Sequence, residues 1–216
     1  MLKKYHVKNL NNILILITII FIFLISVIFV KYFDNNKNLE LAACGINTSV
    51  KSFKSFNEDF NLIHEDGFLI SREQLIDQPS LIYFGYTYCP DICPFDLMRN
   101  AQVVELLKNE NIKIKPIFIT LDPKRDTLET LKEYTDFHHN DMIGLTGSEN
   151  DIQKIKDIFM VYSQMPNDLS GDYILNHSTF TYFVLPKIGL TTYFTRKDNV
   201  IKISDTVKCI LENINP

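Results

Sequence analysis

The feature that most limits how this chain can fold is a short apolar run that leads directly into a proline-marked helix start. Residues 81–86 read Leu-Ile-Tyr-Phe-Gly-Tyr, an apolar and aromatic run typical of a buried central strand. Residues 89–94 then read Cys-Pro-Asp-Ile-Cys-Pro, and proline is tolerated in the first turn of a helix but not in later turns. The sequence therefore predicts a strand–helix junction with two cysteines in the first helical turn.

The pattern on both sides of this junction indicates an α/β domain. Further strands are expected at 60–63, 68–70, 112–121, 142–145, 179–185 and 190–194, with a tight turn at Asp66-Gly67. Further helices are expected at 127–138, 149–162 and 203–214, the first capped by Thr127, or by Thr130 in a capping box with Glu133. A strand–helix–strand half followed by a hairpin and a final helix predicts a thioredoxin-like sheet with insertions. The 46% hydrophobic content is enough for a real core in a chain of 216 residues.

A second constraint is the uninterrupted apolar run at 13–30, which predicts a single transmembrane helix. A helix of this length, at about 1.5 Å per residue, covers roughly the hydrocarbon thickness of a bilayer. Residues 1–12 contain three lysines and no acid, so this tail should stay in the cytoplasm. We therefore expect a linker at 31–55 and a domain at 56–216 in the periplasm, anchored in a bacterial inner membrane. The net charge of −4 argues against a nucleic-acid partner.

Two other kinds of N-terminal segment fit less well. A cleaved signal peptide has a shorter apolar region of about 7–15 residues that ends at a small-residue cleavage site. Residues 41–44, Leu-Ala-Ala-Cys, resemble a lipoprotein cleavage box, but the charged stretch 34–40 separates them from the apolar run. We therefore expect Cys44 to be an ordinary linker residue. Cys209, beside the apolar face of the last helix, is expected to be a partly buried free thiol.

The cysteine pair 89 and 93 is chemically ambiguous when taken alone. Cysteines four residues apart lie on one face of a helix, about 5–6 Å apart at Cβ, which allows a shared metal ion and, if the turn relaxes, a disulfide. The helix N-terminus favours thiolate over thiol, and thiolate is both the metal ligand and the nucleophile. A purely structural disulfide is the least favoured alternative, because so short a loop gains little stability.

The surrounding motifs resemble the Sco/SenC family of thioredoxin-like copper proteins. They are the segment FGYTYCPDICP at 84–94, LDPKRDT at 121–127, IGLTG at 143–147 and YILNHS at 173–178. The resemblance implies that Cys89, Cys93 and His177 bind copper, as Cu(I) or Cu(II). It also implies delivery of copper to a copper-bearing subunit of cytochrome c oxidase, or to another copper carrier. For Asp122, Arg125 and Asp126 we expect structural roles, with Arg125 paired to a carboxylate.

Two alternative functions share this fold. A thiol-disulfide reductase would use Cys89 and Cys93 to keep the oxidase's copper-site cysteines reduced, and His177 would then be dispensable or would only tune the thiols. A peroxidase is disfavoured, because the Pro-x-x-x-Thr/Ser-x-x-Cys pattern is missing from the sequence. Copper delivery by ligand exchange involves no turnover, so we do not expect an enzyme in the ordinary sense, although thiol-disulfide oxidoreductase activity is compatible with the same cysteines.

Overall fold

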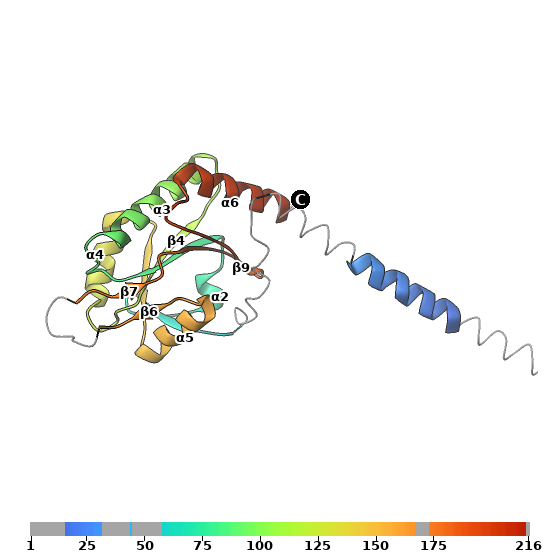
Figure 1. The fold of residues 1–216 in the computed structure, drawn as a ribbon, viewed down its shortest axis with the longest axis horizontal. Helices are drawn as coiled ribbons and strands as arrows, with labels where there is room; N and C mark the ends of the chain where they lie inside the picture. The colour runs from blue at the N-terminus through green and yellow to red at the C-terminus, as the bar shows by residue number, and fades with distance from the viewer. Residues whose placement is uncertain (1–15, 32–43, 45–57, 167–172, 215–216) are drawn as a thin grey trace, which may run out of the picture.

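The computed structural model describes residues 16–31, 44, 58–166 and 173–214. A seven-stranded mixed sheet with the order β2-β1-β5-β4-β3-β8-β9 forms the centre of the domain (Figure 1). Its strands are β1 (Asn61–His64), β2 (Leu69–Ser71), β3 (Ser80–Gly85), β4 (Lys115–Thr120), β5 (Ile143–Thr146), β8 (Thr181–Leu185) and β9 (Gly189–Phe194). The helices are α2 (Arg72–Leu75), α3 (Ile92–Asn109), α4 (Leu128–His138), α5 (Glu149–Phe159) and α6 (Val200–Ile214). A separate two-stranded sheet pairs β6 (Ser163–Gln164) with β7 (Asn176–His177).

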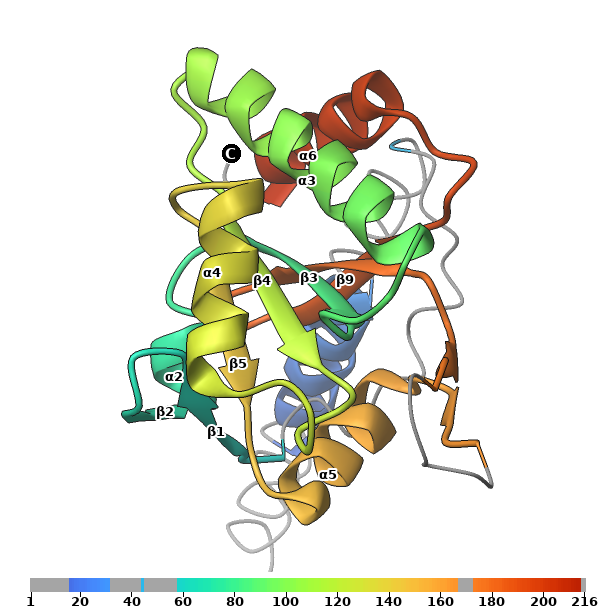
Figure 2. The same cartoon turned by 90° about the vertical axis from the view of Figure 1, so that its left-hand side faces the viewer.

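Helices cover both faces of the sheet. Figure 2 shows α3 and α6 on one side of the sheet and α5 on the other. The central strand β3 is buried along its whole length, as predicted, since it lies between parallel β4 and antiparallel β8. Its alternating side chains reach opposite layers: Tyr83 contacts Asp96 of α3, and Phe84 packs on Phe159 of α5. The arrangement confirms the predicted thioredoxin-like α/β fold.

The predicted local signals are also confirmed where the chain turns. β3 ends at Gly85 and α3 begins at Ile92, so the cysteine segment does join a strand to a helix. The prediction of both cysteines in the first helical turn is correct for Cys93 only, because Cys89 lies in the turn before the helix. Thr127 caps α4 by accepting a hydrogen bond from the backbone N–H of Thr130. The hairpin between β1 and β2 turns at Gly67, which has a φ of 87°. Glycine adopts this left-handed backbone without a steric penalty.

The predicted membrane anchor is only partly covered by the structure. Residues 16–31 are helical, and their large apolar side chains are exposed. Within the described ranges, no helix combines the length and the apolar character needed to cross a membrane. The tail at 1–12, the first part of the predicted span and nearly all of the linker at 31–55 lie outside the described residues. The predicted boundaries of these segments therefore stay predictions.

The expectation of a free thiol at Cys209 is wrong, because Cys209 forms a disulfide with Cys44. The two Cα atoms are 5.6 Å apart, and Cys44 is buried in the apolar cluster between the sheet, α3 and α6. Cys44 is therefore part of the domain's packing and not an ordinary linker residue. The bond joins positions 165 residues apart, and a local pattern carries no information about so distant a partner.

Candidate metal centre

Three potential metal ligands meet at the carboxyl end of β3. The ligand atoms of Cys89, Cys93 and His177 all lie within 4.8 Å of one another. Cys89 follows β3 in a turn closed by its own N–H, which donates to the Tyr86 carbonyl. Cys93 lies in the first turn of α3, and His177 lies in β7. The fold thus brings together the three residues that the family resemblance singled out.

The two cysteines are free thiols in a buried environment. The backbone N–H of Cys93 donates to the Cys89 sulfur at 3.4 Å, as expected for an acceptor at the start of a helix. Cys93 is completely buried, whereas Cys89 is 8% exposed. An incoming metal or substrate therefore meets Cys89 before Cys93.

The pKa values of the two thiols are displaced in opposite directions. A hydrogen bond from the Cys93 thiol, helped by the Cys93 backbone N–H, lowers the pKa of Cys89 well below its usual 9.0. The adjacent Cys89 thiolate, together with burial, raises the pKa of Cys93. At neutral pH the pair therefore holds one thiolate and one proton between two sulfurs. A soft cation that binds both sulfurs would displace this proton.

His177 presents one specific nitrogen to the sulfurs. Its Nε2 lies 3.5 Å from the Sγ of Cys93, and its Nδ1 lies 2.9 Å from the carbonyl oxygen of Ser178. Because a carbonyl oxygen can only accept, Nδ1 carries a proton, which leaves Nε2 as the ring nitrogen available to a metal ion. A ligating histidine is commonly held through its other ring nitrogen in this way.

Close packing around the site includes residues that the sequence patterns did not single out. The rings of Tyr83 and Tyr86 both meet His177 edge-on, with centroids 6.5 and 5.8 Å away. Gly85 is needed for space, since a Cβ there would lie 2.9 Å from the Cys93 sulfur. Glycine at a strand end is a recognisable sign of such a close approach, so this role could have been predicted.

The donor set suits a soft metal ion. Two thiolates and one imidazole are ligands that favour Cu(I), and with an additional weak ligand they also hold Cu(II). Structural zinc sites usually have four protein ligands, whereas only three potential ligands gather here among the described residues. The same two sulfurs, taken without the histidine, also form a chemically competent redox dithiol.

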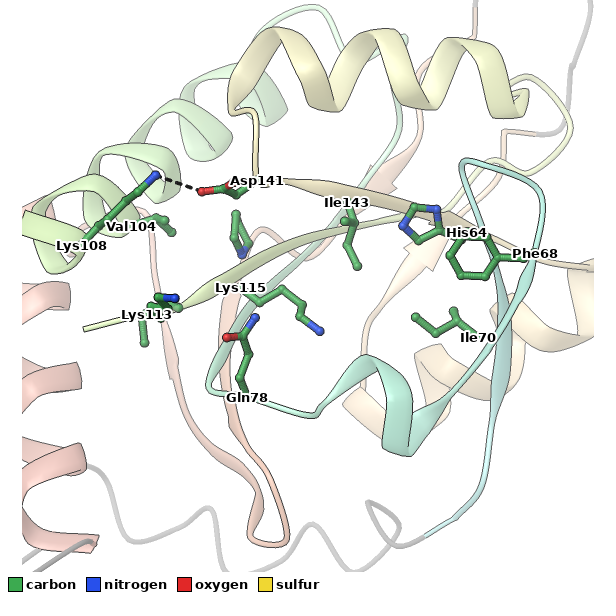
Figure 3. A pocket seen from close by; sticks show the side chains of 12 residues that line it. His64, Phe68, Ile70, Gln78, Val104, Lys108, Lys113, Lys115, Asp141 and Ile143 are labelled. Atoms are coloured by element: carbon green, nitrogen blue, oxygen red, sulfur yellow. Dashed lines mark hydrogen bonds and ion pairs between the residues drawn. The ribbon is translucent and has the colours of Figure 1, made fainter. Parts of the chain in front are cut away.

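A hollow at the other end of the sheet does not compete with this site. It has a volume of about 630 Å³ and lies near the start of β4, where Figure 3 shows three lysine side chains. Lys108 pairs with Asp141 at 3.1 Å, and Lys115 pairs with Asp77. Since acidic partners already neutralise two of the lysines and no thiol lines the hollow, it offers no comparable chemistry.

Comparison with known proteins agrees with the fold and the motifs. The family model described as SCO1/SenC matches residues 48–212. Protein SenC of Rhodobacter capsulatus is 37% identical over 171 residues, covering 79% of this chain and 77% of that protein. A SCO2-like protein of Rickettsia felis is 46% identical over 128 residues, covering 58% of this chain and 62% of its own length.

Solved structures give the same result. A crystal structure of Arabidopsis thaliana ScoI with copper bound has a TM-score of 0.68 and 31% identity, covering 73% of this chain and 99% of that one. Yeast Sco1 with copper bound has the same TM-score and identity, covering 72% of this chain and 87% of its own. From the matched motifs, the fold and these relatives together, it follows that the chain belongs to the SCO1/SenC family.

Proposed function

We propose that this protein is a copper chaperone that binds copper through Cys89, Cys93 and His177. The observation that carries the proposal is the direction of His177, whose Nε2 faces the Cys93 sulfur at 3.5 Å while Nδ1 is held by a backbone carbonyl. A redox dithiol needs no such third ligand. The related plant and yeast structures contain bound copper, which supports copper as the metal.

The arrangement of the ligands suits reception and release of copper. Cys89 is already a thiolate and is the more exposed sulfur, so it makes the first bond. Cys93 then gives up its proton, and His177 completes the set. Because the three ligands come from two different segments of the chain, a partner's ligands can replace them one at a time. We propose the copper-bearing subunit of cytochrome c oxidase, or another copper carrier, as that partner.

We further propose that residues 13–30 anchor the protein in a bacterial inner membrane with the domain in the periplasm. The exposed apolar side chains of the helix at 16–31 support this placement. Alkaline extraction of membranes should leave the full chain in the membrane pellet, and protease added to spheroplasts should digest the domain. Release into the soluble fraction, or protection of the domain, would contradict the placement.

A second function, thiol-disulfide reductase, is favoured by the lowered pKa of Cys89. A low-pKa thiolate at a helix N-terminus attacks disulfides readily. In that role His177 would act only by tuning the pKa of Cys89, which it helps to lower, and not as a metal ligand. The two functions therefore make different predictions for the removal of this one side chain.

The decisive experiment is a Cu(I) titration of the full chain in detergent, reduced and anaerobic, against a competing chelator. We expect one-to-one binding that weakens by more than about 10–100-fold in His177→Ala, because loss of a ligand should exceed the usual effect of a supporting residue. His139→Ala is the matched control, because His139 pairs with Glu105 and is not one of the three clustered ligands. Binding that is indifferent to His177→Ala would favour the reductase, whose reduction potential would then be measured.

A further inference from the structure

The position of His177 needs an explanation, because its own strand is too short to hold it. Cys93 and His177 are 84 residues apart in sequence. β7 consists of Asn176 and His177, and it pairs with the equally short β6. Strands of usual length in proteins have about 5–6 residues, and an isolated pair is marginal in water. Other contacts must therefore hold the segment that carries His177 against the cysteines.

Arg125 makes those contacts from the loop that follows β4. Its guanidinium carbon lies 3.4 Å from the ring centroid of Tyr173, 4.9 Å from that of Tyr88 and 5.6 Å from that of Tyr86. Tyr86 and Tyr88 precede Cys89, while Tyr173 lies four residues before His177. A single cation thus contacts the cysteine segment and the histidine segment at once. Cation–π contacts of this kind are each worth about 0.5–2 kcal/mol.

Asp122 completes the connection between Arg125 and Tyr173 by accepting a hydrogen bond from each. It is fully buried, and its two oxygens accept from different partners: Oδ2 from the Nε of Arg125, and Oδ1 from the hydroxyl of Tyr173 at 2.9 Å. One carboxylate therefore orients both the cation and the ring on which it stacks. Hydrogen bonds with a charged partner are about twice as strong as neutral ones.

A third contact fixes the backbone between Tyr173 and His177. The backbone N–H of Leu175 donates to the hydroxyl of Tyr86 at 3.2 Å, two residues before His177. The ring of Tyr86 also meets the imidazole edge-on. Residues 173, 175 and 177 are thus all connected to the segment that leads into Cys89: residue 173 through Arg125, and residues 175 and 177 through Tyr86.

Within the described parts of the chain, the Arg125 guanidinium lacks a complete set of hydrogen bonds, because its buried Nη2 has no partner there. Leaving a buried donor unpaired costs about 1–3 kcal/mol. An arrangement selected for stability alone would gain by pairing this donor, whereas in the present one the guanidinium carbon lies over the rings of tyrosines from both ligand segments.

We propose that Asp122, Arg125 and Tyr173 form a positioning cluster that holds His177 in reach of Cys89 and Cys93. The inference rests on the proposed copper site and names the residues that make it a three-ligand site. Without the cluster, two thiolates stay available and can still bind Cu(I), since soft thiolates alone suit that ion. What is lost is the imidazole ligand, and Cu(II) binding depends on this ligand more than Cu(I) binding does.

The test is a double-mutant cycle on the full chain in detergent, read out by Cu(I) affinity and by the electron paramagnetic resonance spectrum of the Cu(II) form. Tyr173→Phe removes only the hydroxyl that Asp122 accepts from, and Arg125→Ala removes the stack. We expect weakening of roughly 10-fold and up to 100-fold respectively, as for other residues that orient metal ligands. In the His177→Ala background neither change should weaken binding further, because the residue they position is gone.

The controls separate this inference from the proposed function. Tyr162→Phe is the matched change, since its hydroxyl bonds Gln164 in β6 and lies outside the cluster. If Arg125→Ala does not fold, as judged by the thermal melt of the metal-free protein, Arg125→Lys and Tyr173→Phe carry the test. The positioning role is wrong if His177→Ala weakens Cu(I) binding but the cluster variants keep the Cu(I) affinity and the Cu(II) electron paramagnetic resonance spectrum of the unmodified chain. If His177→Ala has no effect either, the copper site itself has failed.

Discussion

Removal of the Cys44–Cys209 disulfide should lower the free energy of unfolding by about 2–5 kcal/mol. The bond spans 165 residues, and closing a loop of that length restricts the unfolded chain by about 5 kcal/mol. A denatured chain that keeps some structure gains less freedom when the bond is broken, which sets the lower part of the range.

The variant for this test is Cys44→Ser with Cys209→Ser, which leaves no unpaired sulfur at this place. Asn213, whose side-chain nitrogen lies 3.5 Å from the Cys44 sulfur, can donate to the new hydroxyl. Urea unfolding of the full chain in detergent should show a lower midpoint with little change in copper affinity, because both ligand cysteines lie elsewhere. Reductant should lower the midpoint of the unmodified chain to that of the variant. Equal midpoints, or four alkylated cysteines in the unfolded unreduced chain, would refute the reasoning.

Three smaller predictions follow from the same structure. Gly85→Ala should cost about 1–3 kcal/mol in urea unfolding and weaken Cu(I) binding, since the new Cβ would meet the Cys93 sulfur at 2.9 Å; unchanged affinity would contradict this. Because the pKa of Cys89 lies below its usual 9.0, iodoacetamide should alkylate the reduced, metal-free protein nearly as fast at pH 6 as at pH 8, whereas an ordinary thiol slows about 100-fold. Ser148→Ala removes a capping box of α5 and should cost about 1 kcal/mol in the same unfolding assay, with copper affinity unchanged.

The strand–helix junction was predictable because its signals are local. An apolar run predicts β3, and the two prolines place the start of α3 within a few residues of where it is observed, at Ile92. The end of α3 has a local signal too, since the helix stops at Asn109 and Asn111 adopts the left-handed backbone that asparagine tolerates after a helix. Such signals lie within one or two turns of the feature they predict.

The short helix α2 was missed although a signal for it exists. Ser71 accepts from the N–H of Gln74, while the Gln74 side chain accepts from the Ser71 N–H, a complete capping box. The pattern Ser-x-x-Gln was therefore present at 71–74, but no apolar period of helical length follows it. The strands β6 and β7 gave no comparable signal, because two residues are too few to show the alternation of apolar and polar side chains that marks a strand.

The site itself was predictable only in part. Local chemistry placed the two cysteines together, but it could not connect them to His177, which lies 84 residues after Cys93. The family resemblance supplied that residue. Arg125 was expected to pair with a carboxylate, and it does pair with Asp122, but its stacking on tyrosines from two distant segments is visible only in three dimensions.

The two cysteine pairs differ in state, because Cys44 and Cys209 are bridged while Cys89 and Cys93 are free. Sequence separation does not favour the bridged pair, since closing a loop of 165 residues costs the unfolded chain more entropy than closing a loop of 4. The fold overcomes this cost by holding the Cα atoms of Cys44 and Cys209 5.6 Å apart, a separation that a disulfide spans. In the other pair the lowered pKa of Cys89 acts against a bridge, because stabilising the thiolate stabilises the reduced form of the pair. The same chain can thus keep one pair closed and the other open.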